Sequence, residues 1–211
     1  MSFAREGLPF VGVLAGAVLV ADALNLWWVG TFLLLATLAV ASFFRDPERD
    51  VPEGDNLVVS PADGKVVAVD AEASSQSLPG EKLQRLSIFM SPANDHVNRI
   101  PRSGTVVSVK HTPGKFVAAY RENASVENER NEVAIRDEKG RPIIFVQIAG
   151  LLARRIICRL TPGQAVRQGE RFGLIMFGSR VDVYMPKSAI LRVHIGEHVR
   201  AGADILAEFP S

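Results

Sequence analysis

A serine that directly follows a glycine, Ser179 after Gly178, stands inside the apolar run FGLIMFGSRVDVYMP. An esterase nucleophile needs a second glycine two residues after the serine, but Arg180 and Val181 follow Ser179 here. Two interpretations remain: a serine that attacks its own backbone, and a Gly-Ser turn or bulge between two strands. Taken alone, so short a motif favours the turn.

Self-attack would give this pair a definite chemistry. The Ser179 hydroxyl adds to the Gly178 carbonyl and forms an ester, and β-elimination then cleaves the ester. The dehydroalanine left at the new N-terminus tautomerises to an imine, which water hydrolyses to a ketone with release of ammonia. Glycine lets the backbone distort for the attack. Such a ketone can condense with an amine and accept the electrons released when CO2 leaves, which is the role of pyridoxal cofactors elsewhere.

The 211-residue chain has 24 basic and 23 acidic residues, so no bulk positive charge indicates nucleic-acid binding. Its single cysteine, and the lack of a CxxC or His/Cys cluster, give no sign of a metal site. Positive charge is concentrated locally in six arginines, with Glu170 as the one acid among them: Arg154, Arg155, Arg159, Arg167, Arg171 and Arg180. These arginines either meet phosphate groups or an anionic membrane surface, or form a solvated strand face.

Two apolar runs near the N-terminus predict a membrane-associated helical hairpin within residues 1–49. Leu8–Ala21 has 14 residues and is short for a span, whereas Leu26–Phe44 has 19. A helix of that second length covers about 28 Å and matches the hydrocarbon core. Re-entrant segments or two buried core helices are the alternative.

The charges around these runs predict their orientation. Arg5 precedes the first run, Arg45 and Arg49 follow the second, and the connection carries no positive charge. Because positive residues stay on the cytoplasmic side, we expect both ends of the hairpin there.

From Asp50 onward the pattern predicts a mainly β domain. Short β-branched runs recur between glycines and prolines, with a turn every eight to twelve residues. The runs are NLVVS, KVVAVDA, RLSIFMS, TVVSVKH, EVAIRD, IIFVQIAG, RIICRL, FGLIMFG, VDVYMP and ILRVHIG. The polar segment Ala118–Arg130 breaks this rhythm, and we expect a loop or short helix over the sheet.

Internal repeats sharpen this prediction. PADGKVVAV at 61–69 is echoed by PRSGTVVSV at 101–109, and GQAVRQG at 163–169 by GEHVRAG at 196–202. The second pair resembles the turns of biotinyl and lipoyl barrel-sandwich modules, with glycines at positive φ and the valines in the core. We therefore expect residues 50–211 to form a barrel-sandwich-like β domain after the hydrophobic helical hairpin.

Six segments in order resemble the short, membrane-associated form of the phosphatidylserine decarboxylases. They are FFRDPER at 43–49, SPADG at 60–64, NDHVNRIPRSG at 94–104, ENERN at 127–131, QIAGLLARRI at 147–156 and GERFGLIMFGSRVDVYMP at 169–186. The resemblance implies a pyruvoyl-dependent proenzyme that cuts itself between Gly178 and Ser179. The β chain, 1–178, and the α chain, 179–211, would form a heterodimer that can assemble further, with Ser179 becoming the pyruvoyl group and neither metal nor pyridoxal phosphate required.

The resemblance also implies the acid-base groups. Asp63 in SPADG matches the aspartate that assists self-cleavage, although an Asp-Gly turn explains the same residues. His96 matches a histidine near the site, and a neutral imidazole can move protons at pH 7. Longer family members have a second histidine where this chain has Arg99. Either His96 serves both steps, or Arg99 binds the substrate's carboxylate or phosphate while water carries a proton.

Two functions are therefore open. The first is a lyase at the cell membrane, with its catalytic domain on the cytoplasmic side, that converts phosphatidylserine to phosphatidylethanolamine. The second is a membrane-tethered, non-catalytic barrel-sandwich binding or adaptor module, in which the chain stays intact. The second function leaves the Gly178-Ser179 pair without a role.

Overall fold

The computed structural model describes residues 2–75, 77–78, 80–119, 124–151, 155–176 and 179–210. The chain divides into two units, Met1–Glu48 and Arg49–Ser211. The first unit contains the two apolar runs of the sequence, and the second contains the β-branched runs, so each unit is built from one kind of hydrophobic pattern.

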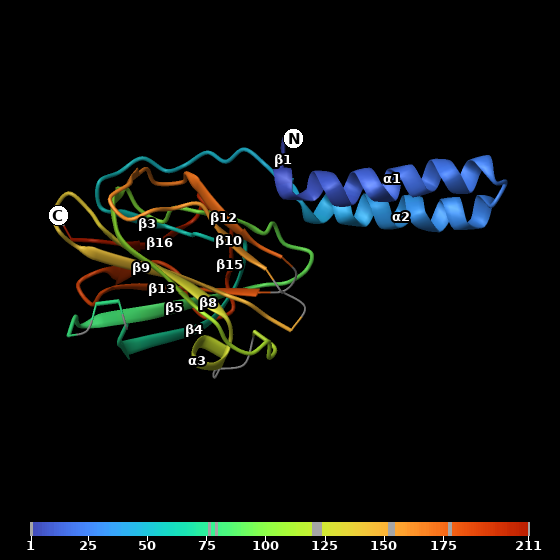
Figure 1. The fold of residues 1–211 in the computed structure, drawn as a ribbon. Coiled ribbons are helices and arrows are strands. Elements are labelled where there is room, and N and C mark those ends of the chain that lie inside the picture. The colour runs from blue at the N-terminus through green and yellow to red at the C-terminus, as the bar shows by residue number, and fades with distance from the viewer. Residues whose placement is uncertain are drawn as a thin grey trace. The chain divides into compact units, whose positions relative to one another are not determined.

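The first unit is a hairpin of two helices (Figure 1). A 3-10 turn, Arg5–Gly7, leads into α1 (Leu8–Ala23), and α2 is Trp27–Phe43. Asn25 in the connection has a φ of 56°, a left-handed conformation that asparagine tolerates better than most residues. The flanking residues pair as β1 (Ser2–Phe3) and β2 (Arg45–Asp46).

The lengths of the two helical segments reverse the expectation from the sequence. Arg5–Ala23 has 19 residues and is long and apolar enough to cross a membrane, whereas Trp27–Phe43 has 17 and is shorter. The first segment is longer than its apolar run because the 3-10 turn adds residues before Leu8 and the helix continues past Asp22.

The second unit is mainly β, which confirms the predicted fold class. Its strands are β3 (Leu57–Val59), β4 (Gly64–Ala73), β5 (Leu83–Met90), β6 (Val97–Arg99), β7 (Gly104–Thr112), β8 (Arg130–Arg136), β9 (Pro142–Ile148), β10 (Ile156–Cys158), β11 (Ala165–Val166), β12 (Arg171–Ile175), β13 (Ser179–Pro186), β14 (Ile190–Leu191), β15 (His198–Val199) and β16 (Ile205–Glu208). The predicted strand ILRVHIG is wrong beyond its first two residues: β14 ends at Leu191, and after one more hydrogen bond, from Arg192 N–H to the Leu206 carbonyl, the chain leaves the sheet and turns.

An eight-stranded curled sheet forms the body of this unit, with the order β11-β7-β8-β9-β13-β5-β4-β15 (Figure 1). Two three-stranded sheets, β10-β12-β6 and β14-β16-β3, contribute residues such as Phe172, Ile175 and Leu206 to the core on its inner face. That face is lined by alternate residues of the central strands, for example Val181 and Val183, as period-two alternation requires.

The repeated turns behave as predicted. The glycines at both ends of GQAVRQG and GEHVRAG have φ between 73° and 100°, and Val166 and Val199 are 3% and 2% exposed. The polar segment contains the short helix α3 (Ala124–Glu127), which agrees with the expected loop or short helix. Tyr120–Asn123 of that segment lie outside the described residues.

Candidate active site

Ser179 is the first residue of β13 and is fully buried. Its strand lies between β9 and β5, and Ser179 pairs with Met90, the last residue of β5. Because side chains alternate along a strand, Ser179 shares the inner face with Val181 and Val183. Its Oγ lies 3.4 Å from the Met90 Sδ, a weak hydrogen-bond acceptor. The hydroxyl is therefore held in the protein interior.

A chain of buried amides continues from this contact. The Nδ2 of Asn98 in β6 lies 3.8 Å from the Met90 Sδ, and Asn98 Oδ1 accepts a hydrogen bond of 2.9 Å from Gln147 Nε2. Asn131 Nδ2 donates to Gln147 Oε1 at 3.3 Å. Asn98 and Gln147 are fully buried. Paired polar groups in an apolar interior fix one another's positions. Asn98, Gln147 and Asn131 therefore form a rigid, buried amide cluster, which Met90 connects to Ser179.

Asp63 lies in the loop between β3 and β4 and belongs to a cluster of three charged groups. Arg49 Nη2 lies 2.8 Å from Asp63 Oδ2 and 2.7 Å from Asp95 Oδ2, so one guanidinium joins two carboxylates. The backbone N–H of Ala201 donates to Asp63 Oδ1 at 2.6 Å. Asp63 and Asp95 are only 8% and 5% exposed.

Burial dominates the ionisation of Asp63. Desolvation raises its pKa, the Ala201 N–H and the Arg49 charge lower it, and the nearby Asp95 raises it; together these effects move the pKa from 3.8 to about 6. A carboxyl group of this kind exchanges protons close to neutral pH, whereas an ordinary aspartate does not.

The sheet brings Asp63 and Ser179 to the same end of two strands that lie on either side of β5. β4 begins immediately after Asp63 and pairs with β5 through Lys65 and Phe89, while Ser179 pairs with Met90 on the other side of β5. Two strand spacings, about 10 Å, therefore separate the start of β4 from the start of β13. This close packing needs a glycine, since a Cβ at Gly64 would lie 2.2 Å from the Phe89 carbonyl oxygen.

His96 stands at the same end, between β5 and β6, and is fully buried. Its Nδ1 lies 2.8 Å from the carbonyl oxygen of Asn94. A carbonyl oxygen only accepts, so Nδ1 donates and Nε2 is the proton-accepting atom of the neutral ring. The His96 carbonyl accepts from the N–H of Ile175, the last residue of β12. The chain segment before Ser179 is thus tied to His96.

Arg99 and Gly178 complete the predicted residues. Arg99 is 5% exposed and donates from Nη1 to the Gly169 carbonyl at 3.1 Å. Its Cδ would lie 2.8 Å from a Cβ added at Gly202, so the side chain packs between the two repeated turns. Its contact with substrate stays a prediction. Gly178, the predicted cleavage residue, lies outside the described residues.

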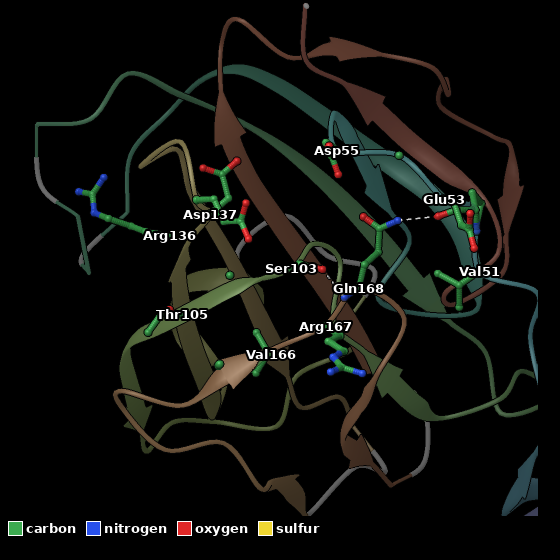
Figure 2. Close-up of a pocket in the computed structure, with 15 residues that line it drawn as sticks. Val51, Glu53, Asp55, Ser103, Thr105, Arg136, Asp137, Val166, Arg167 and Gln168 are labelled. Carbon is green, nitrogen blue, oxygen red and sulfur yellow. Dashed lines mark hydrogen bonds between the residues drawn. The ribbon is translucent and has the colours of Figure 1, made fainter.

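A cavity of about 680 Å³ lies elsewhere in the domain, between residues 51–55 and the strands β7 and β11 (Figure 2). The residues described around it include Asp137 and Gln168 but none of the predicted site residues. Asp137 is already bound by Arg102 and Arg141, at 2.8 and 2.7 Å. We therefore do not place the active site there. Within the described ranges, no group of three or more His, Cys, Asp or Glu side chains could hold a metal ion.

The sequence reasoning missed Arg49, Asp95, Asn98, Gln147 and Asn131, although each lies inside a segment quoted above. Gln147 carried a usable signal: it occupies an inward position of the apolar strand IIFVQI, where a polar side chain needs a buried partner. Arg180 was expected among solvated or phosphate-binding arginines. This is wrong, because Arg180 is 2% exposed and paired with Asp182.

Comparison with known proteins agrees with the family resemblance seen in the sequence. The family model for phosphatidylserine decarboxylase matches residues 36–207. A protein of Syntrophus aciditrophicus named phosphatidylserine decarboxylase proenzyme is 45% identical over 207 residues, which cover 98% of this chain and 97% of the relative. Proteins with the same name from Ralstonia nicotianae and Paramagnetospirillum magneticum are 47% and 48% identical, covering 97% and 98% of this chain and 94% and 87% of the relatives. The chain therefore belongs to the phosphatidylserine decarboxylase family and is a decarboxylase.

Proposed function

We propose that this protein converts phosphatidylserine to phosphatidylethanolamine after it cuts itself between Gly178 and Ser179. The cut leaves a β chain, 1–178, and an α chain, 179–211, which stay together as a heterodimer. Ser179 becomes a pyruvoyl group at the start of the α chain. The observation that carries this proposal is the buried Ser179 hydroxyl at the head of β13, at the same end of the sheet as Asp63 and His96.

The surroundings of Ser179 suit self-processing better than hydrolysis of another molecule. Among the described residues its Oγ contacts a thioether and not a histidine, so they do not form the serine–histidine hydrogen bond of a hydrolase. The hydroxyl is also fully buried, and the peptide bond that it would attack is the one that joins Ser179 to Gly178. Because the two reacting groups belong to adjacent residues, no substrate has to enter for the first step.

Asp63 is the group to which we assign proton removal from Ser179. With a pKa of about 6, most of the carboxyl is ionised at pH 7 and its basicity still exceeds that of an ordinary aspartate. Arg49 and the Ala201 N–H hold the two carboxylate oxygens in place. One water can bridge the remaining gap to the hydroxyl, since strand spacing puts the two backbones about 10 Å apart.

His96 is the group to which we assign proton transfer during decarboxylation. A pyruvoyl group at residue 179 supplies a ketone that binds the substrate amine and withdraws the electrons left when CO2 departs. Nδ1 of His96 is engaged with Asn94, so Nε2 is the atom that delivers or removes the proton. The hydrogen bond between the Asn98 and Gln147 amides keeps the side chains of the buried amide cluster in one arrangement.

The hairpin supports action on a lipid at a cell membrane. Val13, Leu19, Trp27 and Phe32 on α1 and α2 are all at least 70% exposed, which a bilayer but not water favours. The arginines Arg5, Arg45 and Arg49 at the hairpin's ends favour the cytoplasmic side for the catalytic domain. Tethering there keeps the domain at a high effective concentration of headgroups.

Intact-mass analysis of the purified full chain tests the proposal. We expect two chains, with residues 179–211 carrying a ketone that reacts with a hydrazide reagent. Ser179→Ala should remain a single chain without the ketone. As a matched control, Ser75→Ala removes another buried serine, whose Oγ binds Glu132 at 2.9 Å, and should be cut like the wild type. A stable, uncut wild-type chain would instead support the non-catalytic binding module.

A further inference from the structure

Arg180, the residue after Ser179, is a buried cation in the middle of a sheet. It is 2% exposed, and strand alternation sends its side chain to the outer face, opposite the Ser179 hydroxyl. Arginine is among the residues least often buried completely. A valine or leucine would fill a strand position of this kind without bringing a charge into the interior.

Among the described residues, three contacts hold the Arg180 guanidinium. Its Nε lies 2.6 Å from Asp182 Oδ1 and its Nη2 lies 3.2 Å from Asp182 Oδ2, a bidentate pair. Nη2 also donates to Ser87 Oγ at 2.6 Å. Asp182 and Ser87 are both fully buried. The planar guanidinium matches this fork, which an ammonium group could not reproduce.

These contacts join segments on both sides of the proposed cut. Arg180 and Asp182 belong to the α chain, whereas Ser87 lies on β5 of the β chain. Asp182 Oδ2 also accepts a hydrogen bond of 2.8 Å from Ser125 Oγ in α3, another β-chain element. The guanidinium therefore crosses from the first residues of β13 to the neighbouring strand.

The position of Ser179 explains why such a contact matters. The register of β13 pairs Ser179 with Met90 of β5, whereas its pairing with β9 begins only at Arg180. Once the chain is cut, residue 179 becomes an N-terminus that pairs with β5 but not with β9. Chain termini fray unless they are tied down, yet a reacting group needs its geometry fixed to about 0.5 Å.

We propose that Arg180, clamped by Asp182 and Ser87, is a positioning residue that holds the terminal residue 179 in register after cleavage. This inference rests on the proposed function, because only a cut chain has a terminus there. The clamp acts through the backbone of β13 and does not touch the substrate. Its loss should therefore lower turnover without changing substrate binding.

The test compares full-length variants in detergent micelles containing phosphatidylserine. We measure kcat relative to the amount of cut chain that carries the ketone, and call this kcat per ketone. For Arg180→Met we expect it to fall between about ten- and a hundredfold, the usual effect of a misplaced reacting group, with KM unchanged. Amide hydrogen exchange at residues 180–183 should become faster. Ser87→Ala removes one hydrogen bond but keeps the ion pair, so its effects should be smaller and in the same direction.

Arg102→Met is the matched control. Arg102 is also buried, at 6% exposure, and its Nε binds Asp137 at 2.8 Å in a part of the domain away from Ser179. It should lose stability but keep the wild-type kcat per ketone. The inference is overturned if cut Arg180→Met turns over normally, or if Arg102→Met loses kcat by the same factor. If Arg180→Met is not cut, Ser87→Ala becomes the test. A wild-type kcat per ketone and a wild-type rate of amide hydrogen exchange in Ser87→Ala would then overturn the inference. A wild-type chain without a ketone overturns the proposed function instead.

Discussion

Replacing Arg49 by glutamine should change the pH at which the chain cuts itself. If ionised Asp63 is the base, the cleavage rate of the wild type rises with pH and levels off above a midpoint of about 6. Arg49 is 2.8 Å from Asp63 and lowers its pKa, so its removal raises the midpoint. A neighbouring arginine typically lowers the pKa of an aspartate by about one to three units.

The size of the effect follows from this shift. For a midpoint that moves from about 6 to about 8, the ionised fraction at pH 7 falls from about nine-tenths to about one-tenth. Arg49→Gln should then cut itself roughly ten times more slowly at pH 7 and at nearly the wild-type rate at pH 9. The assay follows the conversion of newly refolded full-length chain into two fragments by denaturing electrophoresis between pH 5 and pH 9.

Asp95→Asn is a control that should shift the pH midpoint of self-cleavage in the opposite direction. The Asp95 charge and its hydrogen bond both raise the pKa of Asp63, so this variant should move the midpoint below the wild-type value. Arg141→Gln, which disturbs the distant pair with Asp137, should leave the midpoint unchanged. A rate lowered by one factor at every pH in Arg49→Gln would show that Arg49 is only structural, and a midpoint that moves down would refute the electrostatic reasoning.

Three further predictions concern other parts of the chain. Gly64→Ala should lose about 1–3 kcal/mol of unfolding free energy in urea titrations, because its Cβ would lie 2.2 Å from the Phe89 carbonyl oxygen; unchanged stability would contradict the tight packing of β4 on β5. His96→Gln should lower decarboxylation per ketone by about 10²–10⁴-fold, the usual contribution of an acid-base group, and normal turnover would exclude His96 from proton transfer. Deleting residues 1–44 should reduce activity on bilayers more than on soluble short-chain phosphatidylserine, whereas equal losses would mean that the hairpin serves stability.

The strands could be predicted because their apolar residues alternate. In β13 the run VDVYMP places Val181 and Val183 inward, and in the repeated turns the glycines mark positive φ. ILRVHIG misled because its composition is that of a strand while most of it lies outside the sheet. Composition records propensity, and tertiary pairing decides whether a strand forms.

The charged contacts of the site could not be predicted in the same way. Arg49 meets carboxylates 14 and 46 residues away, and no periodicity connects residues at such separations. Arg180 and Asp182 are different: two residues apart on a strand, they lie on one face, so strand alternation offered a signal for their pairing that the sequence analysis did not use. The sequence did not reveal that this face is covered by α3, where Ser125 binds Asp182.

The place of β13 between β5 and β9 has a consequence for the lifetime of the enzyme. In the proposed mature form, the strand that carries the reactive ketone is hydrogen-bonded on both sides to the other polypeptide. A damaged ketone therefore cannot be exchanged as a dissociable cofactor can, because releasing its carrier would mean opening the main sheet. In this form the cofactor of a given protein molecule is never replaced. Lost activity then returns only through synthesis of a new precursor.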